Sequence, residues 1–211
     1  MAVMDLPDEL ALPLASGERY WYWLGGRPAL DLVNTLRERW WRRVETLVTP
    51  DDLGRWLVAA GVADAAPPVA HADLVRARAL REAIDAAVVA ATDGRPLPPG
   101  TDVALAAPLT AAPPRETVVT RPDGALSVAV TRGGTPAAQA LAAVALDAAR
   151  MLGPDGLERV RICASPTCSA RFFDRSPAGR RRWCSMQDCG NVEKARRHRR
   201  RAREQGQEQA A

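Results

Sequence analysis

The sequence is poor in cysteine and histidine, and it contains no long apolar run. Only four of its 211 residues are cysteine and only two are histidine, which leaves few groups for Cys/His catalysis. No stretch approaches the ~20 consecutive apolar residues that a membrane-spanning helix needs. The first ten residues carry acids and a proline where a signal peptide has basic and apolar segments. We therefore expect no membrane partner and a cytoplasmic location.

Enzyme signatures are also absent from the sequence. It has neither a glycine-rich phosphate-binding loop nor an H-E-x-x-H pair, and its carboxylates follow no spacing that would pair them. No cysteine remains for a nucleophile outside the pattern described next. We therefore expect a protein that is not an enzyme and has no catalytic residues.

The four cysteines form two copies of one spacing, Cys163-x4-Cys168 and Cys184-x4-Cys189. Two short loops that each offer a pair of thiolates can complete the closed, tetrahedral coordination of a structural Zn2+ ion. The alternative is two disulfides, with three connectivities open to four cysteines. Because no other feature indicates secretion, we interpret all four cysteines as ligands of one Zn2+.

Charge is distributed unevenly along the chain. Residues 158–203 contain 14 basic and 4 acidic side chains, whereas residues 1–157 contain 15 basic and 19 acidic ones. Residues 158–203 therefore carry a formal net charge of +10, and residues 1–157 carry one of −4. Bound zinc with four thiolates would leave the C-terminal part strongly cationic. Such asymmetry indicates a polyanionic partner.

The basic residues of the C-terminal part fall into two groups. One lies in the loop before the second cysteine pair, and the other follows that pair on a predicted helix that Asn191 would cap. The candidate nucleic-acid contacts are Arg180, Arg181, Arg182, Asn191, Lys194, Arg196, Arg197, Arg199, Arg200, Arg201 and Arg203. A solvated charged face is the alternative for such a run. Between the cysteine pairs, Phe172, Phe173 and Trp183 form either a small core around the metal or a base-stacking surface.

Hydrophobic periodicity predicts a helix-rich body with one β-hairpin. The expected helices cover residues 29–43, 50–60, 72–92 and 136–152, and the expected strands cover residues 117–121 and 126–131. Trp40 is expected to be buried beside Leu36. Asp31 and Asn34 interrupt the apolar pattern of the first helix, and we expect their side chains to bond backbone groups of a neighbouring turn.

Two features of the middle of the chain leave the pattern less clear. Residues 94–114 contain six prolines, and they form either a short helix near residues 102–107 or a mobile flap over a pocket. In the hairpin, Leu126, Val128 and Val130 alternate with polar residues, which predicts that they point inward.

The predicted fold class is α+β. A helix-rich body with a β-hairpin covers residues 1–157, and a small C-terminal zinc-finger module with four cysteine ligands, ending in a basic helix, covers residues 158–204. Residues 205–211 are expected to be a disordered tail.

Two motifs resemble a known family. The segment Gly25-Gly-Arg-Pro-Ala-Leu-Asp-Leu-Val-Asn-Thr-Leu36 resembles the opening of the ABATE domain, and Cys163–Cys189 followed by Gly190-Asn191 resembles the CGNR zinc finger. The resemblance implies a bacterial, stress-linked transcription regulator whose finger binds DNA through a zinc centre at the four cysteines. The sequence departs from the signature at Val192, where the family has arginine.

These patterns together predict zinc-dependent nucleic-acid binding, with DNA as the expected partner. The body is expected to sense a small-molecule effector or to mediate homodimerisation. The rival hypothesis is a protein-interaction or RNA-associated module in which zinc is purely structural. One contiguous cationic face would favour DNA, and dispersed arginines would favour the rival.

Overall fold

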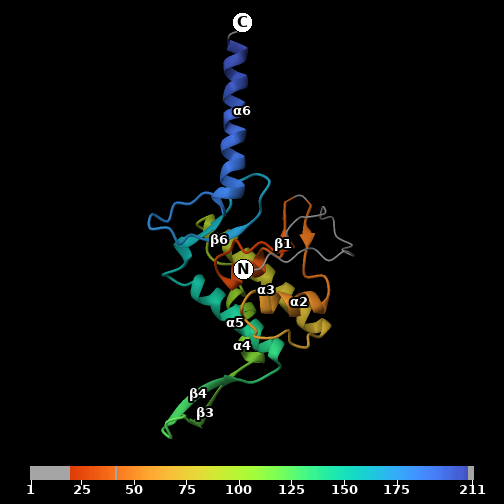
Figure 1. Cartoon of the computed structure of the whole chain (residues 1–211), viewed down its shortest axis with the longest axis vertical. Coiled ribbons are helices and arrows are strands. Elements are labelled where there is room, and N and C mark those ends of the chain that lie inside the picture. The colour runs from red at the N-terminus through yellow and green to blue at the C-terminus, as the bar shows by residue number, and fades with distance from the viewer. Residues whose placement is uncertain (1–19, 41, 209–211) are drawn as a thin grey trace.

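The computed structural model describes residues 20–40 and 42–208, without the side chains at 198 and 201–208. Its helices are α1 (Pro28–Val33), α2 (Pro50–Ala59), α3 (His71–Thr92), α4 (Thr101–Ala111), α5 (Pro136–Met151) and α6 (Asn191–Glu208), with short helical turns η1 (Leu157–Arg159) and η2 (Met186–Gly190). Its strands are β1 (Leu36–Arg37), β2 (Val44–Glu45), β3 (Pro114–Thr120), β4 (Leu126–Arg132), β5 (Val160–Ile162) and β6 (Arg171–Phe173). Consecutive strands pair antiparallel in three two-stranded sheets. α6 projects from one end of the molecule and the β3–β4 hairpin from the other (Figure 1).

The core of the body lies where α1, α3 and α5 pack together. Leu30 of α1, Ile84 of α3 and Val144 of α5 are fully buried, and Trp56 of α2 belongs to the same cluster. Val160, the first residue of β5, is also part of it. The helix-rich α+β fold is therefore confirmed, and the C-terminal module shares the core of the body.

Local signals fix where α2 and α5 begin. The Thr49 hydroxyl accepts a hydrogen bond from the Asp52 backbone N–H (3.2 Å), and the Asp52 carboxylate accepts one from the Thr49 backbone N–H (2.7 Å). This reciprocal capping box, with Pro50 at the first helical position, starts α2. Thr135 caps α5 by accepting from the backbone N–H of Ala138 (3.2 Å). The predictions for these two helices and for α3 are confirmed.

The helix predicted over residues 29–43 is confirmed only as far as α1 extends. The side chain of Asn34, at its end, bonds the backbone of Arg171 in the C-terminal module. The chain then forms β1 and β2, and the turn between them holds Glu38 in the left-handed region at φ 50°. A right-handed helix cannot continue through such a backbone. Trp40, predicted to be buried, is 51% exposed in this turn.

The β3–β4 hairpin is confirmed, but its predicted orientation is wrong. Leu126, Val128 and Val130 were expected to point inward and are 72%, 65% and 66% exposed. Val118, which pairs with Val128 across the two strands, is 69% exposed. The hairpin extends away from the body (Figure 1). Alternation predicted the strand period correctly, but it could not show whether a second layer covers the apolar side.

Residues 94–114 contain α4, so the helical alternative is confirmed and the mobile flap is wrong. The helix is longer than the expected 102–107, and it packs against α3 and α5. At the C-terminal end α6 continues to Glu208, so residues 205–208 are helical rather than part of a disordered tail. In the described part of the chain, no helix is long and apolar enough to span a membrane.

Candidate metal centre and nucleic-acid interface

Two loops bring the cysteines together between the body and α6. The first loop connects β5 to β6, and the second leads into η2. The backbone N–H of Ala164 in the first loop donates to the carbonyl oxygen of Arg182 in the second (2.8 Å). The residues that meet there are Cys163, Cys168, Cys184 and Cys189, all as free thiols.

The sulfur atoms have the spacing of a tetrahedral metal site. All four lie within 4.8 Å of one another. The Cys184 sulfur is 3.8 Å from that of Cys168 and 3.6 Å from that of Cys189. Metal–sulfur bonds of about 2.3 Å in a tetrahedron imply sulfur–sulfur edges of about 3.8 Å, whereas a disulfide bond is about 2.0 Å long. The four sulfur atoms therefore have the geometry of a metal site, and the alternative of two disulfides does not describe this structure.

The aromatic residues of the module pack mainly as a core. Phe172 is 1% exposed and lies in one buried cluster with Cys163 and Cys184, and Trp183 packs partly buried against it. Phe173 packs against the core of the body instead. The predicted small core is therefore confirmed for Phe172, which packs around the cysteines, and Phe173 joins the module to the body.

Asp174 organises the long loop between the two cysteine pairs. Its carboxylate is fully buried, and it accepts hydrogen bonds from the backbone N–H groups of Ser176 (3.0 Å) and Arg181 (2.8 Å) and from the Ser176 hydroxyl (2.7 Å). Sequence reasoning missed this residue. The available signal was an acid that directly follows Phe172 and Phe173 and stands shortly before the turn-forming residues Ser-Pro-Ala-Gly.

The three arginines of this loop have different surroundings. Arg181 turns inward, where its guanidinium donates to the carbonyl oxygen of Cys184 (2.7 Å) and lies 5.1 Å from the Phe172 ring. Arg180 and Arg182 are exposed. Arg181 therefore supports the metal loop itself, whereas its two neighbours are available to a ligand.

α6 continues directly from η2, which Ser185 caps. Asn191 was predicted to be the N-cap of this helix, and that is wrong: its backbone is helical, and its side chain donates to the carbonyl oxygen of Gln187 (3.2 Å). Glu193 fastens the helix to the first cysteine loop by accepting from the hydroxyl of Ser165 (3.2 Å). The direction of α6 is thus set by both metal loops.

A cationic cavity of about 280 Å³, here called the arginine notch, lies between the second loop and α6. The residues of α6 in it are spaced three and four apart, which places them on one helix face. The guanidinium of Arg182 lies 5.4 Å from the Trp183 ring, and the carboxylate of Glu193 pairs with Arg196 at 2.7 Å. The notch is lined by Ala164, Arg182, Trp183, Glu193, Arg196, Arg197 and Arg200.

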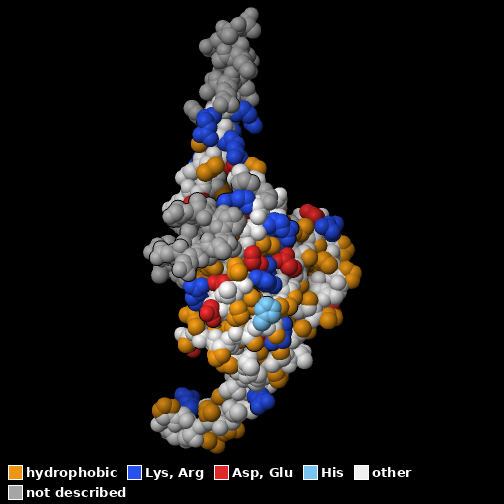
Figure 2. All heavy atoms as spheres, turned by 90° about the vertical axis from the view of Figure 1, so that its right-hand side faces the viewer, with side chains coloured by type: hydrophobic (Ala, Val, Ile, Leu, Met, Phe, Trp, Pro, Cys, Tyr) orange, Lys and Arg blue, Asp and Glu red, His pale blue; other side chains and the backbone are white. Residues whose placement is uncertain are grey.

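The remaining predicted contacts lie outside the notch. Lys194 and Arg199 are exposed on other faces of α6. Arg201 and Arg203 lie further along the helix, beyond the described side chains. Basic side chains gather where α6 leaves the molecule, whereas acidic and basic groups are mixed over the body (Figure 2).

The N-terminal glycine motif holds the module against the body. The carbonyl oxygen of Gly25 accepts from the backbone N–H of Phe173 (2.8 Å), and its own N–H donates to Asp31 (2.8 Å). A Cβ on Gly25 would lie 2.7 Å from the backbone nitrogen of Asp31, so a larger residue does not fit. The expectation of a bond to a neighbouring turn is confirmed for Asp31, which bonds Gly25. For Asn34 the expected partner is wrong, because its side chain bonds the backbone of the distant Arg171.

A buried ion pair crosses the same contact. The Arg171 side chain is 3% exposed, and its Nε lies 2.6 Å from Oδ1 of Asp85 on α3. Arg39 approaches the other oxygen of Asp85 at 3.2 Å. Burial lowers the pKa of the Arg171 guanidinium, and the charge of Asp85 opposes that shift. Sequence reasoning missed this pair; the available signal was an acid directly after Ile84 on the apolar stripe of α3.

Comparison with protein families matches both parts of the chain. Residues 26–155 match the ABATE family, described as a putative stress-induced transcription regulator, and residues 159–202 match the CGNR zinc finger. No curated protein matches the sequence. The first match covers more than half of the chain, and the second covers all four cysteines and the notch.

Proposed function

The chain belongs to the ABATE family and carries a CGNR zinc finger, and we propose that it is a zinc-dependent, DNA-binding transcription regulator that responds to stress. The arginine notch is the observation that carries this proposal. It gathers four guanidinium groups on one surface, and the one carboxylate among the described residues that line it is already paired with Arg196. Guanidinium groups bind phosphate oxygens strongly.

The position of the metal site explains why DNA binding at the arginine notch would need zinc. Both walls of the notch begin next to a metal ligand, because Cys184 follows Arg182 and Trp183, and Cys189 precedes α6 by two residues. Zinc bound by Cys163, Cys168, Cys184 and Cys189 would supply a closed structural centre without an open coordination position. The chain's own residues then hold the walls: Ala164 bonds Arg182, and Ser165 bonds Glu193.

The exposed cations extend the proposed contact beyond the notch. Arg180 lies on the same loop, and Lys194 and Arg199 lie on the same helix. We also retain Asn191, Arg201 and Arg203 in this surface, whereas Arg181 is assigned to the loop itself because its guanidinium bonds Cys184. The four guanidinium groups gathered at the arginine notch support DNA binding over the protein-interaction or RNA-associated alternative.

Fluorescence anisotropy tests the proposal with labelled duplex DNA, single-stranded DNA and RNA of one sequence. The full chain is compared after loading with zinc and after chelation. We expect the zinc-loaded protein to bind duplex DNA most tightly and the chelated protein to lose that binding. Tighter binding of RNA, or equal binding after chelation, would contradict the proposal.

For the body we propose sensing of a small-molecule effector or homodimerisation, in a cytoplasmic protein. The four free thiols support a reducing compartment. A dimer would present two copies of α6, as many regulators of paired DNA half-sites do. Sedimentation velocity at several concentrations tests the second role: a concentration-dependent rise to twice the monomer mass is expected, and a monomer throughout would contradict it.

A further inference from the structure

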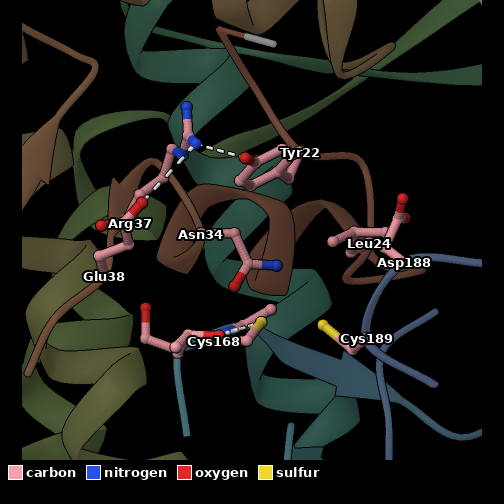
Figure 3. A pocket seen from close by; sticks show the side chains of 11 residues that line it. Tyr22, Leu24, Asn34, Arg37, Glu38, Cys168, Asp188 and Cys189 are labelled. Atoms are coloured by element: carbon pink, nitrogen blue, oxygen red, sulfur yellow. Dashed lines mark hydrogen bonds and ion pairs between the residues drawn. The ribbon is translucent and has the colours of Figure 1, made fainter. Parts of the chain in front are cut away.

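A second cavity, separate from the arginine notch, lies beside the metal site. Its volume is about 340 Å³, and it lies between the N-terminal part of the body and the two cysteine loops. Tyr22 and Leu24 line it from the body, and Cys168 and Cys189 line it from the loops (Figure 3). A cavity of this size admits water and small solutes to the metal ligands.

The four sulfur ligands are not equally accessible. Cys163 and Cys184 are each 4% exposed, and neither lines this cavity. Cys168 and Cys189 are only half-buried and face it. A small oxidant that enters the cavity therefore meets these two sulfurs first.

The two accessible sulfurs also differ from each other. The sulfur of Cys168 accepts a hydrogen bond from the backbone N–H of Ala170 (3.4 Å), which stabilises the thiolate and reduces its nucleophilicity. For Cys189 the described residues provide no such backbone donor, and its sulfur lies 3.6 Å from the Cys184 sulfur. Cys189 is thus the more reactive sulfur, and a buried second sulfur lies next to it.

We propose that Cys189 is a peroxide-reactive site and that Cys184 resolves it as a disulfide, which opens the metal centre. The Cys189 thiolate attacks one peroxide oxygen, so that an S–O bond forms, the O–O bond breaks and hydroxide leaves. The Cys184 thiolate then attacks the sulfenic sulfur, so that the S–S bond forms and a second hydroxide leaves. The two sulfurs give up two electrons, and the two hydroxides take protons from solvent to become water.

This oxidation removes two of the four metal ligands at the start of α6. Cys189 precedes the first residue of α6 by two positions, so the new bond acts directly on the segment that positions the arginine notch. The inference rests on the metal site of the proposed function and is independent of nucleic-acid binding. If the purified protein contained no zinc, the metal site of the proposed function would itself be contradicted. If zinc were bound but hydrogen peroxide did not release it, only this inference would be overturned.

The test treats the zinc-loaded full chain with less than one equivalent of hydrogen peroxide. Zinc release is followed with 4-(2-pyridylazo)resorcinol, and disulfides are mapped by peptide mass spectrometry. We expect release together with a first-formed Cys184–Cys189 disulfide, while Cys163 and Cys168 remain thiols. A first disulfide that contains Cys163, or release without any disulfide, would overturn the proposal.

Variants of Leu24 test the access route without replacing a metal ligand. Leu24→Ala widens the cavity and should raise the rate of zinc release several-fold, whereas Leu24→Trp fills it and should lower that rate. Leu157→Ala is the matched control, because Leu157 is also partly buried but packs against the body core away from the cavity. If both Leu24 variants accelerate release, or if Leu157→Ala matches Leu24→Ala, general destabilisation explains the effect and the route is wrong.

Discussion

The side-chain amide of Asn34 brackets the backbone of Arg171, donating to its carbonyl oxygen at 2.9 Å and accepting from its N–H at 2.8 Å. The two residues are 137 positions apart, and both are buried. Asn34 thus acts as a substitute strand neighbour for β6. This contact ties the metal loops to the body, so the position of α6 depends on α1 as well as on the metal.

Replacing Asn34 by alanine should destabilise the whole chain. The backbone N–H and C=O of Arg171 would stay buried without their partner, and each unsatisfied group costs about 1–3 kcal/mol. We expect the free energy of unfolding, measured by urea denaturation, to fall by about 2–6 kcal/mol. Asn191→Ala is the control, because Asn191 is exposed; an equal loss in both variants would contradict the role of Asn34.

Cys184→Ala should affect the body as well as the metal module. The division of the sequence into a body (residues 1–157) and a separate module (residues 158–204) would predict that the body is spared. In the structure, Val160 is part of the body core, and Phe173 packs against that core. Thermal unfolding followed by far-UV circular dichroism and by tryptophan fluorescence should therefore show one shared transition at a lower temperature. A body transition that stays at the wild-type temperature would restore the view of two independent units.

The free energy of unfolding should fall as the pH rises from about 4 to about 7, because of the buried carboxyl group of Asp31. Burial raises the pKa of Asp31 from 3.8 to about 7, against the opposing hydrogen bond from the Gly25 N–H. The folded state therefore holds a proton between about pH 4 and 7 that the unfolded state has lost, and stability decreases over that range. The difference between the two pKa values corresponds to roughly 4 kcal/mol.

Asp31→Asn should remove this dependence, because the amide oxygen can still accept from Gly25 without becoming charged. Urea denaturation at pH 5 and pH 8 is expected to show a smaller difference for Asp31→Asn than for the wild type. Asp64→Asn, at an exposed position, should leave the difference unchanged. A wild type equally stable at both pH values would refute the raised pKa.

Val192 offers a test by gain of function. It is 48% exposed near the start of α6, and the family signature has arginine there. Val192→Arg adds one cation to the proposed phosphate-binding surface. The slope of log DNA affinity against log salt concentration should therefore become more negative by up to about one. Val75→Arg, at a 51% exposed site on α3, should bind like the wild type. Equal effects in the two variants would indicate non-specific charge alone.

Local signals in the sequence were sufficient for much of the fold. The capping box at Thr49 and Asp52 and the cap at Thr135 begin helices where the sequence predicts them, because those hydrogen bonds join near neighbours in the chain. The repeated cysteine spacing identified the metal site for the same reason. Its geometry needs only two short loops.

Long-range contacts account for most of the errors. The helix predicted to reach residue 43 stops at α1, and Asn34 beyond it pairs with Arg171, a partner that no local pattern reveals. The ion pair of Arg171 with Asp85 was missed for the same reason. The apolar alternation of β4 resembles that of a buried strand, yet Val128 remains exposed because the hairpin extends away from the described body.

The salt dependence of binding to duplex DNA tests the role of the arginine notch most directly. If about four to six phosphates are engaged, log affinity should fall against log salt with a slope of roughly −4 to −5. The double variant Arg182→Gln, Arg197→Gln should lose about two from that slope and still retain zinc. Arg95→Gln with Arg121→Gln, at exposed sites outside the notch, should match the wild type. An unchanged slope and affinity in the notch variant would contradict DNA binding at this surface.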